Sequence, residues 1–153
     1  MGGRSYRNEA ARVRSFEAPS GWTQAPQQSY PQLLTAYSHS DGGRLTLTTQ
    51  KLPPGATAAS LAAAAAPNLE KQGYSDLKRA ADPNQPERAR LDGKLDAGRR
   101  FLKQLYVTDG AQAWVLTLVA STVNQPLMER DFEAAARSLV IVPQEAASDE
   151  DAR

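Results

Sequence analysis

The sequence has no cysteine among its 153 residues, and this absence excludes several kinds of chemistry. Disulfides, thiolate nucleophiles and cysteine-ligated zinc are all ruled out, although the redox compartment stays undecided. No apolar run approaches the roughly 20 residues that a membrane-spanning helix needs. Histidine is nearly absent too, because His39 is the single one. Little remains from which to build a metal site or a nucleophilic triad.

A strong net charge is also lacking. Lysine and arginine number 18 against 17 aspartates and glutamates, which leaves a formal charge of +1. A protein whose main partner is nucleic acid usually carries a marked basic excess, so we expect no nucleic-acid partner. With 41% hydrophobic residues the chain can bury one sizeable core. We expect one domain over residues 12–142.

The two ends of the chain differ from its middle. Residues 1–11 are mostly polar and resemble the tether after the lipidated cysteine of a bacterial lipoprotein, so we expect a flexible tether in which Met1 stands where that cysteine was. An ordinary disordered start, or residues left by cloning, explains the same pattern equally well. Residues 143–153 are rich in Glu, Ala, Ser and Asp without an apolar anchor, which predicts a disordered acidic tail.

Strand signals dominate the first third of the chain. A Pro-Ser-Gly turn ahead of Trp22 indicates an edge strand that begins with a buried tryptophan. Residues 33–39 and 44–52 flank a turn with Gly42 and Gly43, which predicts a β-hairpin. Leucine and polar residues alternate in its second strand, the period of a sheet that is wet on one side.

An alanine-rich helix is expected next. Ser60 can cap a helix that begins at Leu61, and Gly73 suits the left-handed position after its end. Pro67 interrupts the pattern, because a proline inside a helix removes a hydrogen bond and costs about 3 kcal/mol. We expect one kinked helix that buries Leu61, Ala65 and Leu69.

The second half of the chain is predicted to be mostly strands, over residues 74–79, 88–91, 94–107 and 112–120. Residues 80–87 contain two prolines and are expected to form a loop. Asp92-Gly93 and Asp109-Gly110 are expected to form turns. The last strand is apolar on both faces, which predicts a central strand covered on each side.

A final helix follows. Asn124 or Gln125 can cap it, and Pro126 fits its first position. The predicted buried stripe has helical spacing and consists of Met128, Phe132, Ala135 or Ala136, and Leu139. The residues expected to face water are Glu129, Arg130, Glu133 and Arg137. Strands with an inserted and a terminal helix predict an α+β fold, an antiparallel sheet with helices packed on it.

This order of elements carries a resemblance. Its motifs are Phe-x-x-Pro-x-Gly-Trp at 16–22, Gln72-Gly73-Tyr74, Leu91-Asp92-Gly93, Trp114-Val115-Leu116-Thr117, and Asp131-Phe132 through Ser138-Leu139. In this order they resemble the PsbP-like superfamily over roughly residues 12–142. The resemblance implies an antiparallel sheet sandwiched by helices in α-β-α order.

That superfamily includes photosystem II extrinsic proteins and a nuclear-transport factor that binds a small GTPase. It also includes bacterial periplasmic lipoproteins of the DcrB type and chaperones for membrane-spanning effectors of contact-dependent secretion. Its members are mostly binding modules, and the resemblance brings no catalytic motif with it. Fold alone does not fix function.

The sequence offers only weak catalytic candidates. His39 lies beside Ser38, Ser40 and Asp41, but neighbouring strand residues point to opposite faces, so we interpret it as a surface histidine at a strand end. Outside the acidic tail, the nearest carboxylate pairs are Asp92 with Asp96 and Glu129 with Glu133. Neither pair has the apolar surroundings that raise a carboxyl pKa for acid catalysis.

Known ligand motifs are also missing. There is no Asp-x-Asp-x-Asp-Gly loop, phosphate-binding loop or dinucleotide fingerprint. We therefore expect no catalytic residue, no cofactor, no metal and no enzymatic activity.

Basic residues gather in the middle of the chain. They are Lys78, Arg79, Arg88, Arg90, Lys94, Arg99, Arg100 and Lys103, against Asp82, Glu87, Asp92 and Asp96. We select as candidate partner contacts Arg88, Arg90, Arg99, Arg100 and Lys103. Such a patch could meet an acidic partner or anionic headgroups. The alternative is a solvated sheet edge whose charges prevent strand-to-strand aggregation.

These observations favour a non-catalytic binding or assembly module. We expect the soluble domain of a bacterial envelope lipoprotein, periplasmic or anchored in the outer membrane, whose partner is another protein or an envelope component. It would meet a membrane only through a lipid anchor that this chain lacks. The alternative is a cytosolic chaperone that shields apolar segments of a secreted effector, which requires an exposed apolar groove. A carboxylate hydrolase would need two carboxyl groups about 5 to 10 Å apart in a pocket.

Overall fold

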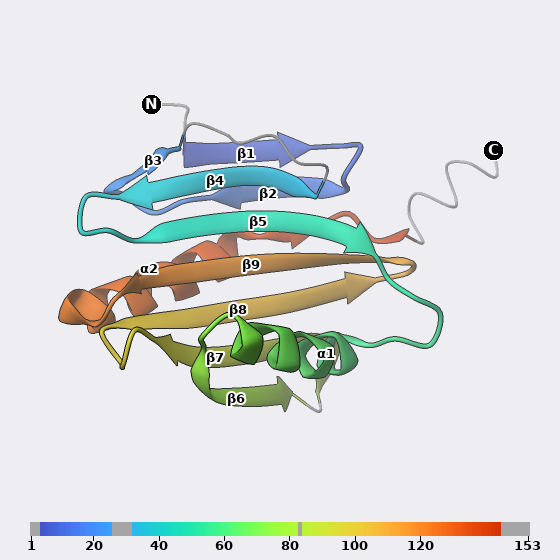
Figure 1. Ribbon diagram of the computed structural model, residues 1–153. Helices are drawn as coiled ribbons and strands as arrows, with labels where there is room; N and C mark the ends of the chain where they lie inside the picture. Colours follow the sequence, from blue (N-terminus) through green and yellow to red (C-terminus); the bar gives the residue numbers. More distant parts are fainter. Residues whose placement is uncertain (1–3, 26–31, 83, 145–153) are drawn as a thin grey trace, which may run out of the picture.

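The computed structural model describes residues 4–25, 32–82 and 84–144, which form two antiparallel sheets and two α-helices (Figure 1). The large sheet has seven strands, in the spatial order β3 (Trp22–Gln24), β4 (Leu33–His39), β5 (Arg44–Lys51), β9 (Gln112–Ser121), β8 (Arg100–Asp109), β7 (Gln85–Leu95) and β6 (Ser75–Asp82). The small sheet has the order β1 (Ser5–Asn8), β2 (Val13–Glu17) and β10 (Val140–Ile141). The helices are α1 (Ala58–Lys71) and α2 (Gln125–Ser138), and a short 3-10 helix (Thr122–Asn124) precedes α2.

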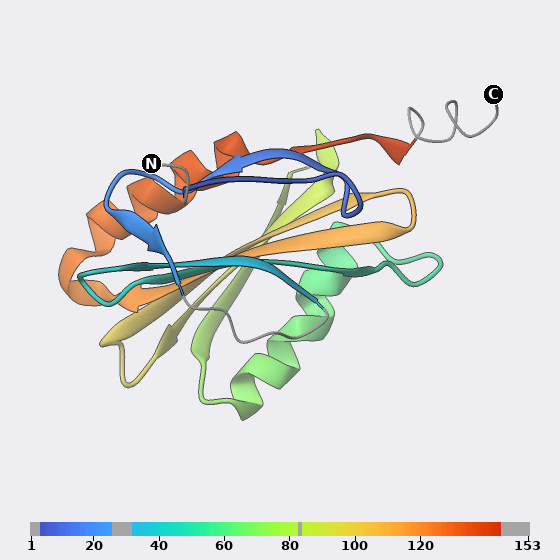
Figure 2. The same ribbon diagram turned by 90° about the horizontal axis from the view of Figure 1, so that it is seen from above.

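The helices cover opposite faces of the large sheet. Figure 2 shows α2 and the small sheet on one side of it and α1 on the other. The fold is therefore α+β, an antiparallel sheet sandwiched by helices, as the sequence predicts. No helix in the described ranges is long and apolar enough to span a bilayer.

The larger core lies between the large sheet and the layer formed by α2 and the small sheet. Alternate residues of the central strands point into it, among them Leu47 of β5 and Leu116 of β9, neither of which is exposed to solvent. The predicted stripe of α2 is confirmed, since Met128 and Phe132 are buried in the same cluster. β9 lies between β5 and β8 with both faces packed, which confirms the predicted central strand. The predicted hairpins at 33–52 and around Gly110 are also confirmed.

A smaller core lies under α1, which packs on β6, β7 and β8. Ala58 and Ala62 are fully buried there, while the predicted contacts Leu61, Ala65 and Leu69 are partly buried against the same cluster. Small alanine side chains let the helix approach the sheet closely.

The helix begins three residues before the predicted start. Thr57 is the N-cap, and it forms a capping box with Ser60, since each side chain accepts the other's backbone N–H. Ser60 is thus the partner of the cap and not the cap itself. Pro67 lies inside one continuous helix, and Gly73 adopts the predicted left-handed conformation with φ 101°.

The prediction for residues 80–95 is wrong in two places. Residues 80–87 are not a loop, because β6 continues to Asp82 and β7 begins at Gln85. Asp92-Gly93 is not a turn either, since both residues pair with β8 in one unbroken strand. The real reversal is at residues 96–99, where Asp96, Ala97 and Gly98 all have positive φ. Gly93 leaves room for Leu77, because a Cβ at this position would lie 2.6 Å from the Leu77 side chain, which would then have to shift.

Part of the predicted N-terminal tether is ordered. Of residues 1–11, Ser5–Asn8 form β1, which pairs with β2, and Tyr6 packs against the larger core. The Ala11 carbonyl accepts a hydrogen bond from the buried indole N–H of Trp114 at 2.9 Å. These contacts explain why the segment is fixed despite its polar composition. Of the predicted tail at 143–153, all but Pro143 and Gln144 lies outside the described residues, as do residues 1–3.

Arg12 joins both ends of the described chain to the large sheet. Its guanidinium donates to the carbonyls of Val142 and Asp109, at 3.0 and 3.1 Å, and forms an ion pair with the Asp109 carboxylate. It also lies 5.2 Å from the ring centroid of Trp114, a cation–π distance. One side chain therefore ties β2, the β8–β9 turn and the segment after β10 together.

Candidate functional site

The most distinctive surface of the described chain is a charged face of β6, β7 and β8. In β7 charged residues alternate with small or apolar ones, so Arg88, Arg90, Asp92 and Lys94 share the face on the α2 side, while Leu91 is buried on the α1 side. On the α2 side of the sheet, α2 packs on β8 and β9, while Asp76, Lys78 and Lys94 farther along the face stay exposed to solvent. We call this surface the charged shelf. Its members are Asp76, Lys78, Arg88, Arg90, Asp92, Lys94 and Lys103, with Glu129 and Glu133 of α2.

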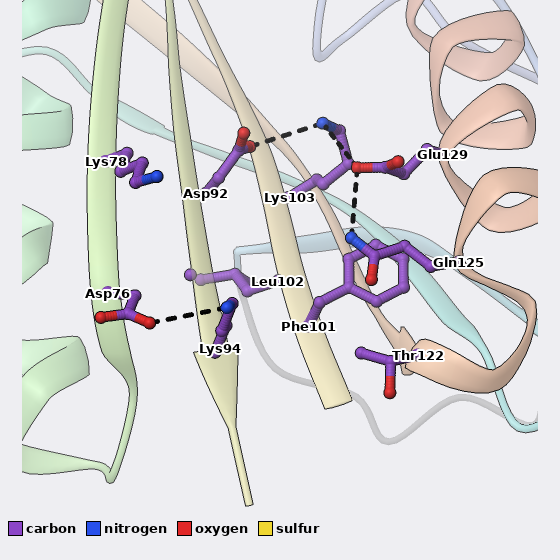
Figure 3. A pocket seen from close by; sticks show the side chains of 11 residues that line it. Asp76, Lys78, Asp92, Lys94, Phe101, Leu102, Lys103, Thr122, Gln125 and Glu129 are labelled. Carbon is purple, nitrogen blue, oxygen red and sulfur yellow. Dashed lines mark hydrogen bonds and ion pairs between the residues drawn. The ribbon is translucent and has the colours of Figure 1, made fainter. Parts of the chain in front are cut away.

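Lys103 is the central cation of the charged shelf. Its Nζ lies 3.6 Å from carboxylate oxygens of both Asp92 and Glu129, and its side chain is only 13% exposed. It also lies 5.9 Å from the ring of Phe132, at a cation–π distance. Figure 3 shows the ammonium between the two carboxylates. Through these two ion pairs the largely buried Lys103 of β8 links β7 to α2.

Arg90 forms the best-defined ion pair of the shelf. Its two terminal nitrogens donate to the two carboxylate oxygens of Glu133 at 2.8 and 2.9 Å. This two-point geometry is more directional than a lysine pair. The prediction that Glu129 and Glu133 face water is therefore wrong, because their carboxylates pair with cations of β7 and β8. Both are half-buried and neutralised by strand residues.

A hollow of about 180 Å³ opens between β6 and the start of α2 (Figure 3). Lys94 and Asp76 form an exposed ion pair of 3.6 Å on its wall. Lys78 also lines it and has no ion pair within the described residues. The hollow is too small and too evenly charged for a large apolar ligand, and its unpaired group is a cation.

A second hollow, of about 290 Å³, lies farther along β6 and β7. Its walls include Ala80, Ala81 and the guanidinium-bearing residues Arg88 and Arg90. Arg90 is committed to Glu133, whereas Arg88 forms no ion pair in the described part of the chain. Each hollow therefore carries one cation that has no carboxylate partner among the residues that the structure describes.

The structure brings three of the five candidate contacts together. Arg88, Arg90 and Lys103 lie on the charged shelf, but Arg99 and Arg100 do not. Arg99 lies in the reversal before β8, and its carbonyl accepts hydrogen bonds from Thr122. Arg100 points to the opposite face from Phe101 by strand alternation and pairs with Asp96 at 3.3 Å.

The sequence prediction counted Lys78 and Lys94 in the basic patch without selecting them as contacts, and it missed Asp76 and the two glutamates as members of the same surface. The alternation from Arg88 to Lys94 was a usable signal. It was obscured because Asp92-Gly93 has the composition of a turn.

His39 is not the exposed histidine that the sequence predicts. It lies at the end of β4, but its ring is 5.2 Å from that of Trp22 and its side chain is only 12% exposed. Its Nδ1 accepts the backbone N–H of Asp41 at 3.1 Å. The Asp41 carboxylate in turn accepts from Asn124, so this group acts as a connection between the hairpin and the start of α2.

Across the described ranges, no cluster of three or more His, Asp or Glu side chains is suited to hold a metal ion. The carboxylates of the charged shelf are held by lysine and arginine at the distances given above. This arrangement can present a fixed pattern of charge to a partner.

Comparisons with known proteins support the fold. No protein-family model matches the sequence, and no curated protein matches it. Among solved structures, the solution structure of cyanobacterial PsbP (CyanoP) from Synechocystis sp. PCC 6803 matches with a TM-score of 0.64. The match covers 90% of this chain and 91% of that one at 13% sequence identity. The fold is therefore PsbP-like, and an identity this low carries no statement about activity.

Proposed function

We propose that this chain is a non-catalytic binding or assembly module whose contact surface is the charged shelf. The observation that carries the proposal is the part of the shelf that α2 leaves open, with its charges fixed in place by ion pairs. Charges that are fixed in position contribute to the specificity and rate of association, because the partner surface must carry a complementary pattern of charge. The near-zero net charge of the chain fits a patterned partner surface better than a uniformly charged polymer.

The test is site-specific photo-crosslinking in the organism that encodes the protein. A benzophenone amino acid would replace Asp92 or Lys94 on the shelf, both about half exposed. Matched positions elsewhere are Lys51 at the end of β5 and Lys71 at the end of α1, which are also exposed. We expect a discrete protein adduct from the shelf positions alone. Adducts from Lys51 or Lys71 alone would place the contact surface elsewhere and contradict the proposal.

We further propose that the module belongs to a bacterial envelope lipoprotein of the DcrB type. The support is the PsbP-like fold together with the polar residues before β1, which are all that remains of the predicted tether. The gene upstream of Gly2 tests it, since a signal peptide ending in a small-residue box and a cysteine is required. A start codon directly at Met1 would end this assignment while leaving the binding proposal intact.

The chaperone alternative has less support. It needs an exposed apolar groove, yet the exposed large hydrophobic side chains of the described residues are only Val123 and Val140. They lie in different elements, before α2 and in β10, and do not form a patch. We therefore place the contact surface on the charged shelf.

A further inference from the structure

The large sheet ends in two very different edges. β3 is the edge strand on one side and has three residues, whereas β6 on the other side has eight. In Figure 1 β6 is the outermost strand, with no described element beyond it. Its residues are exposed along most of its length, apart from Leu77, which packs under α1. Alternate backbone N–H and C=O groups of such an edge face outward without a sheet partner.

The pairing of β6 with β7 is irregular at both ends of β6, since the register also shifts between Ala81 and Asp82, and it is regular between them. Asp76 has φ 52°, and the register with β7 shifts between Ser75 and Lys78. From Lys78 to Ala81 the pairing with β7 is continuous. An added strand could therefore pair with residues 78–81, where Ala80 and Ala81 present little steric bulk.

Beside residues 78–81, the described charged side chains that form no ion pair are all cations. Lys78 on the α2 side and Arg79 on the α1 side flank the edge, and Arg88 lies one strand inward. In the described structure none of the three forms an ion pair, in contrast to Arg90, Lys94 and Lys103. Lys78 and Arg88 line the two hollows along β6, so both can be reached from the edge.

We propose that β6 receives an extended acidic segment of a partner protein, which adds one strand to the large sheet. Carboxylates on one face of that segment would meet Lys78 and Arg88. Cross-strand neighbours lie about 4.5 to 5.5 Å apart at Cβ, within reach of an ion pair with Lys78. Arg88 lies one strand deeper, and the small side chains of Ala80 and Ala81 leave space for it to extend toward the edge.

The same charges argue against a second copy of this chain as the occupant. Opposite residues of an antiparallel pair share a face, so pairing of two β6 strands centred on Arg79 would place Arg79 of one copy directly opposite Arg79 of the other, where like charges are destabilising. An acidic strand turns that repulsion into attraction. This inference rests on the proposed binding function and specifies the partner's chemistry.

The probe is a synthetic heptapeptide, acetyl-Glu-Val-Glu-Val-Glu-Val-Glu-amide, whose glutamates share one face of a strand. It would be titrated into the ¹⁵N-labelled full chain at pH 7, with backbone amide shifts and hydrogen exchange as readouts. We expect saturable binding, with exchange protection confined to amides from Lys78 to Ala81. The Lys78→Glu/Arg88→Glu variant should bind at least tenfold more weakly.

The matched control is Arg44→Glu/Lys51→Glu, which makes the same charge change at two exposed positions of β5. It should bind within about twofold of the wild type, since general attraction alone is weakened equally in both variants. An analogue with N-methylated amides should lose binding, because strand addition needs its N–H groups.

Three results would overturn the inference: no protection of β6 amides, equal weakening in both double variants, or undiminished binding of the N-methylated peptide. In each case β6 is a guarded edge whose cations only prevent aggregation. If the shelf crosslinks at Asp92 and Lys94 still form, the proposed function stands and only strand addition is wrong.

Discussion

Lys103 neutralises carboxylates from two different elements, so its replacement should remove two ion pairs at once and lower stability. Lys103→Met keeps the aliphatic stem but leaves Asp92 and Glu129 without their shared cation. Because the lysine side chain is largely buried while the carboxylates are about half exposed, we expect the free energy of unfolding to fall by about 1 to 2 kcal/mol. Urea denaturation measures this change.

The control for that prediction is Lys94→Met. The Lys94–Asp76 pair is exposed, at 58% and 63% for the two side chains, and such pairs contribute about 0 to 1 kcal/mol. Equal losses in the two variants would mean that Lys103 is no more than another surface charge.

Tyr106 should make the stability of the fold sensitive to alkaline pH. Burial raises its pKa from 10.0 to about 12. Below pH 10 the hydroxyl is protonated in both states, so its full contribution is present. Between pH 10 and 12 the unfolded chain loses the proton first, and stability falls by at most about 3 kcal/mol.

The variant Tyr106→Phe isolates this effect. Its stability should decline less steeply between pH 10 and 12 in denaturation measured across that window. Burial also raises the pKa of Tyr37, but that contribution is the same in both proteins. Parallel stability curves for the two proteins would refute the role given to Tyr106.

At the scale of elements, the proline in α1 carries a penalty that can be removed. Pro67 is exposed and lies inside the continuous helix from Ala58 to Lys71. Pro67→Ala restores a backbone donor and gains about 3 kcal/mol of helix propensity, offset by about 1 kcal/mol from greater freedom of the unfolded chain. We expect a net gain in unfolding free energy of about 1 to 2 kcal/mol by thermal and urea denaturation.

Asn68→Ala is the neighbouring control, because it is also exposed and helical but has no missing donor. It should change stability by less than about 1 kcal/mol. If Pro67→Ala were neutral or destabilising, the helix would already compensate for the proline by other contacts.

The elements that sequence reasoning predicted correctly have local causes. The Gly42-Gly43 hairpin, the apolar β9 and the stripe of α2 follow from turn chemistry and hydrophobic period. The sequence predicts two strands in place of β7, because Asp92-Gly93 also has the composition of a turn. Pairing of these two residues with Lys103 and Leu102 of β8 keeps them in one strand. The partners are 11 and 9 residues apart (103 − 92 and 102 − 93), across the reversal at residues 96–99, so the sequence prediction places the turn at the wrong one of two nearby Asp/Gly sites.

The candidate site was predictable only in part. Clustered basic residues identified Arg88, Arg90 and Lys103, but the carboxylates that neutralise two of them come from α2, more than twenty residues away from Lys103 in the sequence. Which cations stay unpaired is a property of helix placement. The sequence count of charges could not separate Arg88 from Arg90.

At the scale of the whole molecule, the small sheet should be part of the fold's stability and not an appendage. Deleting residues 1–11 removes β1 and the Ala11 carbonyl that satisfies the buried indole of Trp114. A lost strand and an unsatisfied buried donor should lower the free energy of unfolding by about 2 to 4 kcal/mol. A truncated chain as stable as the full one would restore the tether interpretation of this segment.

Arg12 offers a finer test of the same connection. Arg12→Lys keeps the charge but cannot donate to Val142, the Asp109 carbonyl and the Asp109 carboxylate together. We expect a loss of about 1 to 2 kcal/mol, with faster amide exchange in β10. Arg14→Lys, at an exposed position of β2, should leave both measurements unchanged.

The unequal lengths of the two edge strands also limit how many further strands can add to the large sheet. A fibre requires each unit to accept a neighbour on one side and offer an equivalent face on the other. β6 is long enough to accept a strand, but β3 pairs over only three residues and offers no comparable template for the next unit. If a strand adds at β6 as proposed, we therefore expect growth to stop after that single addition, because the described part of β3 gives the next unit too short an edge to pair with.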